Sequence, residues 1–204
     1  MEVYFVRHGE TEWNIQKRFQ GRSNSPLTEN GLKQAKLLAK KLKNIHFDKI
    51  YSSNLKRAIF TAECISEGRN LSVICMDEFA EIGMGKVEGI SNEEFQNIYP
   101  DEYKKFYAND IDYDPSIYGG ETFEETEKRI LKGLKRILNE NKDDSRIIVV
   151  SHGAVLKILF HIFKNEPRLT LCEEPIPKNT SYTIVHFIDG QAKIVDFSNT
   201  DHLK

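Results

Sequence analysis

The chain has 204 residues, of which 29 are Lys or Arg and 31 are Asp or Glu, and its formal net charge at pH 7 is -2. This length suits one α/β domain, and the near balance of charges provides no basic field for nucleic acid or for an anionic membrane surface. We therefore expect no nucleic-acid partner and no membrane partner, and any anion site must be local.

The amino terminus and the cysteines bear on the compartment of the protein. The apolar run before Arg7 is too short for a signal-peptide core or a membrane span. The three cysteines are widely spaced and form neither a CxxC nor a Cys/His ligand pattern, so we interpret them as reduced packing residues. We expect a soluble, cytoplasmic protein.

The first predicted element is a short buried strand over residues 3–6, because this run is apolar and rich in β-branched and aromatic residues. It stops at Arg7 and His8, so a guanidinium and an imidazole would lie at the carboxyl end of the strand. Open α/β sheets bind their ligands at that end of parallel strands. Taken alone, Arg-His-Gly is a short string, and a surface or capping histidine is then the commoner interpretation.

Residues 13–22 show no clear period and predict an irregular loop that folds over this strand end. Thr28 is then a plausible N-cap of a helix. The apolar residues that follow are spaced to form one stripe on this helix, namely Leu32, Ala35, Leu38, Ala39 and Leu42. Its many lysines fit a solvated outer face better than a binding surface.

A second strand is predicted at residues 49–51, and Ser53 after it can cap a second helix. Arg57 falls on the first turn of that helix. From there its guanidinium can reach toward the strand ends, where backbone N–H groups of a helix N-terminus already favour anions. A simple salt bridge with a neighbour is the alternative interpretation of Arg57 by itself.

A third strand is predicted at residues 71–76, and a stretch rich in glycine and carboxylates follows it. Glu81 lies between Ala80 and Ile82, where partial burial would raise its pKa and suit it to proton transfer. Glu88 is a weaker candidate for the same role.

Capping boxes that begin at Ser91 and Thr122 predict two more helices, of which the second is long. We expect residues 82–121 to form a cap segment within a single domain over residues 1–204. Residues 88–127 are rich in Asp and Glu and contain Lys104 and Lys105 as their basic residues, with no arginine. The cap segment is therefore predicted to be acidic.

Residues 147–150 predict another buried strand, which ends at Ser151, His152 and Gly153. The strongly apolar residues 154–163 predict a buried helix whose N-terminus points at the same site. We interpret His161 on this helix as a packed histidine rather than a ligand.

Residues 182–188 and 192–197 flank Asp189-Gly190, which is a strong signal for a β-hairpin. The predicted fold class is therefore α/β, with a mostly parallel mixed sheet flanked by helices and a C-terminal antiparallel hairpin near one edge.

Three apolar runs thus end in residues that suit a phosphate, and with them the chain resembles the histidine phosphatase superfamily, the phosphoglycerate-mutase-like enzymes. The resemblance covers nearly the whole chain, and Ser53-Asn54-Leu55-Lys56-Arg57-Ala58 matches the Ser-x-Leu-x-Arg-Ala pattern of the family. It implies that His8 is the phosphorylated histidine, that Glu81 is the proton donor, and that the phosphate is held by Arg7, Arg57 and His152. It also implies a set of substrate-binding residues, namely Thr11, Asn14, Gln20, Gly21 and Gly153.

These residue types suit phosphoryl transfer, which needs positive and N–H donors around the phosphate and an in-line nucleophile. A neutral His8 offers one unprotonated ring nitrogen, and its phosphorylation would divide hydrolysis into two displacements. The sequence contains no HExxH or HxH motif, and the family needs no metal, so we expect no metal and no cofactor.

The resulting prediction is a metal-independent phosphatase of small phosphomonoesters that works through a phosphohistidine. A 2,3-bisphosphoglycerate-dependent phosphoglycerate mutase is the alternative, but similar mutases carry a longer insertion with adjacent arginines, and an acidic cap would repel a second anionic group. A binding module that has lost catalysis is disfavoured because the catalytic residues are all present. The sequence leaves open whether the substrate is a sugar phosphate, phosphoserine or α-ribazole phosphate, and whether the chain forms a homodimer.

Overall fold

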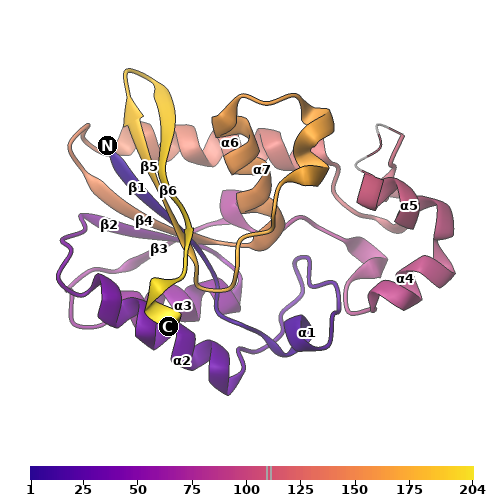
Figure 1. Ribbon diagram of the computed structural model, residues 1–204, viewed down its shortest axis with the longest axis horizontal. Helices are drawn as coiled ribbons and strands as arrows, with labels where there is room; N and C mark the ends of the chain where they lie inside the picture. Colours follow the sequence, from indigo (N-terminus) through magenta and orange to yellow (C-terminus); the bar gives the residue numbers. More distant parts are fainter. Residues whose placement is uncertain (109, 111) are drawn as a thin grey trace.

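Six strands form one mixed sheet in the computed structural model, which describes residues 1–108, 110 and 112–204 (Figure 1). The sheet has the order β3-β2-β4-β1-β5-β6. The strands are β1 (Glu2–Arg7), β2 (Lys49–Ser53), β3 (Val73–Met76), β4 (Arg146–Ser151), β5 (Tyr182–Ile188) and β6 (Gln191–Asn199). The first four pair in parallel, whereas β5 runs antiparallel to β1 and β6 antiparallel to β5. The predicted fold class is confirmed.

Helices cover both faces of the sheet, with α2 and α3 on one face and α6 and α7 on the other (Figure 1). The α-helices are α1 (Glu12–Ile15), α2 (Glu29–Leu42), α3 (Lys56–Ser66), α4 (Asn92–Ile98), α5 (Pro100–Ala108), α6 (Phe123–Glu140) and α7 (Gly153–Lys164). Short 3-10 turns are η1 (Asp77–Phe79), η2 (Gly85–Val87), η3 (Pro115–Tyr118), η4 (Arg168–Glu173) and η5 (Asp201–Leu203). Within the described part of the chain, no helix is both long and apolar enough to cross a membrane.

The two-sided cover explains why β1 is apolar at successive positions. Side chains alternate between the faces of a strand, so Val3 and Phe5 pack with α6 and α7, whereas Tyr4 and Val6 pack with α2 and α3. All four side chains are buried. A strand buried on both faces shows a continuous apolar run instead of alternation.

The hairpin between β5 and β6 forms as its sequence predicts. Asp189 has a φ of 51° and Gly190 a φ of 76°. Positive φ at both central residues is the requirement of the turn that matches the right-handed twist of paired strands, and Asp-Gly is a favoured pair for it. The hairpin lies at the edge of the sheet, on the far side of β1 from β4.

Helix starts were predicted with mixed success. Thr28 caps α2 and accepts a hydrogen bond from the Gly31 backbone N–H at 2.8 Å, as expected. Leu32, however, is 42% exposed and does not belong to the buried stripe. The prediction of an irregular loop over residues 13–22 was partly wrong, because Thr11 and Asn14 form a capping box that starts the short helix α1.

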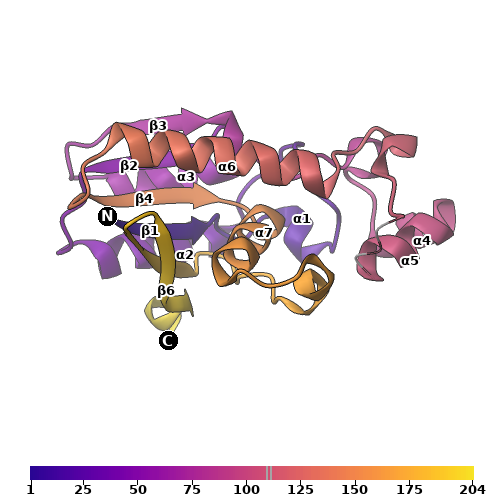
Figure 2. The same ribbon diagram turned by 90° about the horizontal axis from the view of Figure 1, so that it is seen from above.

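Both of the predicted capping boxes that follow are confirmed, at Ser91 for α4 and at Thr122 for α6. Between them, residues 82–121 carry α4 and α5 and lie beyond the carboxyl ends of the parallel strands (Figure 2). This segment has its own cluster of apolar and aromatic side chains around the buried ring of Phe95. The cluster packs against Phe123 of α6 and Ala154 of α7.

Candidate active site

Each of the four parallel strands leads into one of the predicted catalytic residues. His8 follows β1, His152 follows β4, Arg57 lies on the first turn of α3 after β2, and Glu81 follows β3 and the turn η1. Because these strands are neighbours in the sheet, their carboxyl ends meet at one edge. The five residues predicted as catalytic are therefore brought together, with Arg7 as the last residue of β1.

The imidazole of His8 is held in one tautomer. It is 2% exposed, and its Nδ1 lies 2.7 Å from the carbonyl oxygen of Gly9. A carbonyl can only accept, so Nδ1 carries the proton and Nε2 keeps a free lone pair. Burial lowers the pKa of His8 well below its usual value, and the positive charges of Arg57 and Arg7 lower it further. At neutral pH the ring is uncharged and nucleophilic at Nε2.

His152 lies beside His8, with ring centroids 5.1 Å apart and ring planes at 54°. It is fully buried, and its Nε2 lies 2.7 Å from Ser53 Oγ. Burial, with the charge of Arg57 as the next cause, lowers the pKa of His152 well below its usual value. Its Nδ1 finds no hydrogen-bond partner among the described residues.

Ser53 was predicted to cap the helix α3, but in the structure its hydroxyl contacts His152. The helix α3 begins after Leu55, and the Ser53 hydroxyl only accepts from the Leu55 backbone N–H at 3.2 Å, so it is not the N-cap. Ser53 ends β2, which pairs with β4, and this brings its hydroxyl to His152. A sequence pattern read locally gives no sign of this long-range pairing.

Arg57 is buried to 1% exposure and is fixed by main-chain oxygens. Its Nη1 donates to the Ser23 carbonyl and its Nη2 to the Gly21 carbonyl, both at 2.7 Å. Burial lowers the pKa of Arg57 to about 10, which leaves it charged at neutral pH. Its Nε–H has no acceptor in the described part of the chain.

Arg7 adds a second guanidinium. Its Nη1 donates to the Pro177 carbonyl at 2.7 Å, and burial lowers its pKa while the charge of Glu81 opposes that shift. Its buried Nε–H, like that of Arg57, meets no acceptor in residues 1–108, 110 and 112–204. Buried donors without partners carry a free-energy cost, which an anion bound between them would relieve. Arg7, Arg57 and His152 thus each keep one nitrogen that is available to an anion.

Glu81 lies at the N-terminus of α7. Its Oε1 accepts from the Ile82 and Val155 backbone N–H groups at 3.1 and 3.2 Å, and its Oε2 accepts from the Ala154 N–H at 3.3 Å. The residue is partly buried, as predicted. A helix N-terminus favours a carboxylate, which explains how this side chain is held in place.

Arg129 of α6, which has no predicted role, positions the segment before Glu81. Its Nη1 donates to the Glu78 and Ala80 carbonyls, both at 2.9 Å. Its Nε and Nη2 also bond the two oxygens of Glu121 at 2.8 Å each. Burial opposes ionisation of Glu121, but the Arg129 bonds outweigh it and leave the pKa of Glu121 below its usual value. One arginine thus ties the Glu81 turn to the end of the 82–121 segment.

Thr11 and Asn14, predicted as substrate-binding, bond each other. Asn14 Oδ1 accepts from the Thr11 backbone N–H and hydroxyl at 3.1 and 3.0 Å. Asn179, which the sequence did not single out in its proline-rich loop, donates to Asn14 Oδ1 at 3.2 Å and to the His8 carbonyl at 3.0 Å. These residues hold the turn that carries His8.

The other two predicted loop residues, Gln20 and Gly21, belong to the loop whose carbonyls hold Arg57. Gly21 provides one of the carbonyls that hold its guanidinium, and Gln20 is 9% exposed with an unpartnered, buried Oε1 within the described structure. Glu88, the weaker candidate for proton transfer, fastens this loop instead. Its carboxylate accepts from the Arg22 N–H at 2.9 Å and from the Ser23 hydroxyl at 2.5 Å.

Gly153 begins α7, at a position with no room for a side chain. A Cβ at this position would lie 2.9 Å from Ile176 Cγ2 and 3.4 Å from Arg7 Nε. Any larger residue would push the Arg7 guanidinium or the chain around Ile176 away from the site. Gly153 therefore lets Arg7 and α7 approach each other.

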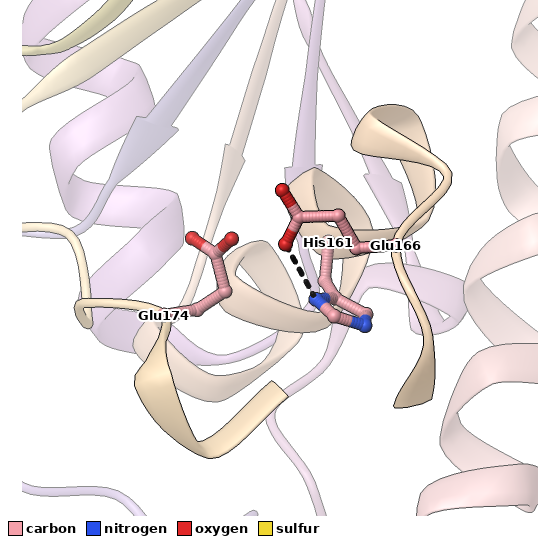
Figure 3. A group of neighbouring side chains, drawn as sticks. All are labelled: His161, Glu166 and Glu174. Atoms are coloured by element: carbon pink, nitrogen blue, oxygen red, sulfur yellow. Dashed lines mark ion pairs between the residues drawn. The ribbon is translucent and has the colours of Figure 1, made fainter. Parts of the chain in front are cut away.

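One group of side chains away from these residues has the atom types of a cation site, and Figure 3 shows it. His161, Glu166 and Glu174 each offer a ligand atom within 4.8 Å of the others. His161 Nε2 lies 3.1 Å from the Pro167 carbonyl, and its Nδ1 lies 3.9 Å from Glu166. Lys164 donates to Glu174 at 2.5 Å and already supplies a positive charge. His161 is buried, with its Nδ1 lacking a hydrogen bond among the described residues, and we assign no metal here.

Comparison with known proteins gives one consistent family. The model of the histidine phosphatase superfamily (branch 1) matches residues 3–200. The chain is 33% identical over 202 residues to an uncharacterized phosphatase, PhoE, of Bacillus subtilis, covering 98% of this chain and 96% of that protein. It is 32% identical over 207 residues to phosphoserine phosphatase 1 of Hydrogenobacter thermophilus, covering 100% and 94%. The solved structure of YhfR from Bacillus stearothermophilus superposes with a TM-score of 0.91, at 32% identity and 100% and 99% coverage. The chain therefore belongs to branch 1 of the histidine phosphatase superfamily.

Proposed function

We propose that the chain is a metal-independent phosphatase, a phosphoric monoester hydrolase that acts on small phosphorylated metabolites through a phosphohistidine at His8. One observation carries the proposal. Arg7, Arg57 and His152 each carry a buried, unpartnered nitrogen, and all three lie near a histidine whose Nε2 keeps its lone pair. Membership of the family and the similarity to phosphoserine phosphatase 1 support a phosphatase.

In the first step, Nε2 of His8 attacks phosphorus and the bond to the ester oxygen breaks. Glu81 in its protonated form gives its proton to that oxygen, so the product leaves as an alcohol. The guanidinium groups of Arg7 and Arg57 balance the charge on the equatorial oxygens, where preorganised donors contribute most. His152 can add Nδ1–H to the same oxygens while its Nε2 accepts from the Ser53 hydroxyl.

In the second step, Glu81 takes a proton from water, and the water oxygen attacks phosphorus. The bond from phosphorus to His8 Nε2 breaks, which releases inorganic phosphate and restores the free imidazole. The hydrogen bond from Nδ1 to the Gly9 carbonyl is kept through both steps. No step needs a metal ion, because the arginines and His152 supply the positive charge and the donors.

The 82–121 segment is proposed as the cap over this site, within a single domain over the whole chain. Its position beyond the carboxyl ends of the parallel strands supports that role (Figure 2). All the groups used in the two steps belong to one chain, so a homodimer stays a separate prediction that sedimentation can test.

The test is the release of inorganic phosphate in EDTA from a panel that contains 3-phosphoglycerate, phosphoserine, sugar phosphates and α-ribazole phosphate. We expect release by the wild type and none by His8→Ala. Loss of activity in EDTA that zinc or magnesium restores would contradict the proposal. If 3-phosphoglycerate became 2-phosphoglycerate only after addition of 2,3-bisphosphoglycerate, with no release of phosphate, the mutase alternative would be correct.

A further inference from the structure

An apolar pocket of about 140 Å³ lies where the 82–121 segment, α6, α7 and the loop after α7 come together. Its walls include Ile82, Phe106, Phe123, Ile158, Leu171 and Ile176. Of the described lining residues, Lys157 is the one that carries a charge, and none is acidic. Pockets lined in this way bind apolar groups.

The pocket begins at the residues that hold Glu81. Ile82 follows Glu81 directly, and Ala154, whose N–H donates to Glu81 Oε2 at 3.3 Å, lines the pocket as well. On the opposite wall, Ile176 Cγ2 lies against Gly153, next to the Arg7 guanidinium. Glu81 therefore bonds a residue of the pocket wall, and Arg7 bonds the carbonyl of Pro177, the residue after Ile176 of the wall.

This position matters because the proton of Glu81 must reach the ester oxygen of the substrate. With the phosphate between Arg7 and Arg57 and the ester oxygen at Glu81, the group attached to that oxygen continues toward Ile82 and Ala154. Those two residues are part of the pocket wall. The pocket is thus positioned to receive the leaving group.

The acidic residues of the 82–121 segment do not give this place a negative lining. Glu102 accepts from Lys105 Nζ at 2.8 Å and from the Asp114 N–H at 3.0 Å, and Glu121 is held by Arg129. What the segment presents to the pocket is the side chain of Ile82 and the rings of Phe106 and Tyr107. The acidic residues of the segment therefore lie outside the pocket lining.

We propose that the substrate is a phosphomonoester whose leaving group is apolar, of the size of one aromatic ring or a short branched alkyl chain. A cavity of about 150 Å³ lined by aliphatic and aromatic side chains holds benzene, which sets the scale. This inference rests on the proposed function, because it uses Glu81 as the proton donor. A leaving group with a carboxylate, as in phosphoserine, would lose its hydration in this pocket, where Lys157 is the one charged lining residue.

The test compares kcat/KM in EDTA for benzyl phosphate, methyl phosphate and phosphoserine. All three are alkyl esters, so the comparison measures the pocket more than the intrinsic reactivity of the leaving group. We expect benzyl phosphate to exceed each of the others by at least about 10-fold, since even one methylene in an apolar pocket is worth about 10-fold or more. Equal rates, or a preference for phosphoserine, would overturn the inference.

A substitution in the wall localises the effect. Ile176 is 56% exposed, so Ile176→Asn spares the core, and we expect it to lower the ratio of kcat/KM for benzyl phosphate to that for methyl phosphate by about 10-fold. The matched control is Ile188→Asn, at 59% exposure on the hairpin, which should change neither substrate. An unchanged ratio of benzyl to methyl phosphate in Ile176→Asn would contradict the assignment of the pocket.

Binding measurements separate this inference from the proposed function. Benzylphosphonate and methylphosphonate cannot be hydrolysed at the carbon-phosphorus bond, and calorimetry gives their affinities without catalysis. We expect the benzyl compound to bind at least about 10-fold more tightly, and Ile176→Asn to remove the difference. Tight, Ile176-dependent binding without turnover of any ester would reject the phosphatase and keep the pocket. Turnover of esters together with equal affinity for both phosphonates would keep the phosphatase and reject the pocket.

Discussion

The two halves of the site are built in different ways. The phosphate half consists of charged and polar side chains at the ends of adjacent strands, such as Arg57 and His152, each held by main-chain or hydroxyl groups. The leaving-group half is an apolar pocket whose walls come from segments as far apart as Ile82 and Ile176. The difference teaches that the sheet positions the residues that act on the phosphate. Packing between distant segments instead determines which leaving group the site accepts.

The largest expected effect breaks the phosphate half while leaving the other half in place. Arg57→Ala should reduce kcat/KM about 100-fold for every ester, or about 3 kcal/mol, because it removes a preorganised donor to the transferring phosphoryl group. The measurement is steady-state phosphate release from benzyl and methyl phosphate. The ratio between the two substrates should not change.

A thermal melt of Arg57→Ala is the control for this variant. Arg57 also bonds the Ser23 and Gly21 carbonyls, so a small loss of stability is expected. If the variant loses its cooperative melt together with activity, Arg57 serves the fold more than the phosphate.

A smaller effect concerns the stability of the fold at acid pH. It should come from the phosphate half, because both buried imidazoles belong to that half. The pKa values of His8 and His152 are lowered mainly by burial. Between these folded-state values and about 6.5 the unfolded chain binds more protons, so stability falls as the pH drops below about 6.5. The loss is up to about 1.4 kcal/mol per histidine for each pH unit.

Denaturant unfolding at pH 7.5 and pH 5.5 tests this prediction. His152→Asn should lose less stability over that interval than the wild type, by about 1.4 kcal/mol. His46→Gln is the matched control, because it removes an imidazole that is 84% exposed. Identical losses in the wild type and in His152→Asn would show that burial of this ring does not control its protonation.

The smallest effect concerns how the phosphate half is held. Ser53→Ala removes the partner of His152 Nε2, which should reduce kcat about 5-fold, in line with the loss of one buried hydrogen bond of about 1 kcal/mol. Ser52→Ala is the matched control, because Ser52 is equally buried and its hydroxyl donates to the Ser53 carbonyl. Equal activities of the two variants would remove Ser53 from the site.

Sequence patterns predicted the residues of the phosphate half but not all of the contacts between them. A strand that ends in Arg7 and His8 is visible in the sequence, because its apolar run and its end are local features. The hydrogen-bond partner of His152 was not visible in the sequence, because the contact with Ser53 depends on the pairing of β2 with β4. The prediction of an N-cap at Ser53 followed a local rule and was wrong for that reason.

The lining of the leaving-group half could not be predicted from the sequence either. The count of acidic residues in the 82–121 segment is a property of the sequence, but the face on which each lies is set by packing. Glu121 is turned to Arg129, and Phe106 is turned to the pocket. Composition predicted an acidic cap, and it could not predict an apolar wall.

The central claim is that His8 carries the phosphoryl group. The direct measurement is peptide mass spectrometry after an alkaline quench during turnover of 4-nitrophenyl phosphate in EDTA, with wild type and with Glu81→Gln. The account predicts one phosphoryl group on the peptide that contains His8, with more of it in Glu81→Gln, because water loses its base in the second step. Release of phosphate without any phosphorylated His8, or with the phosphoryl group on another residue, would contradict it.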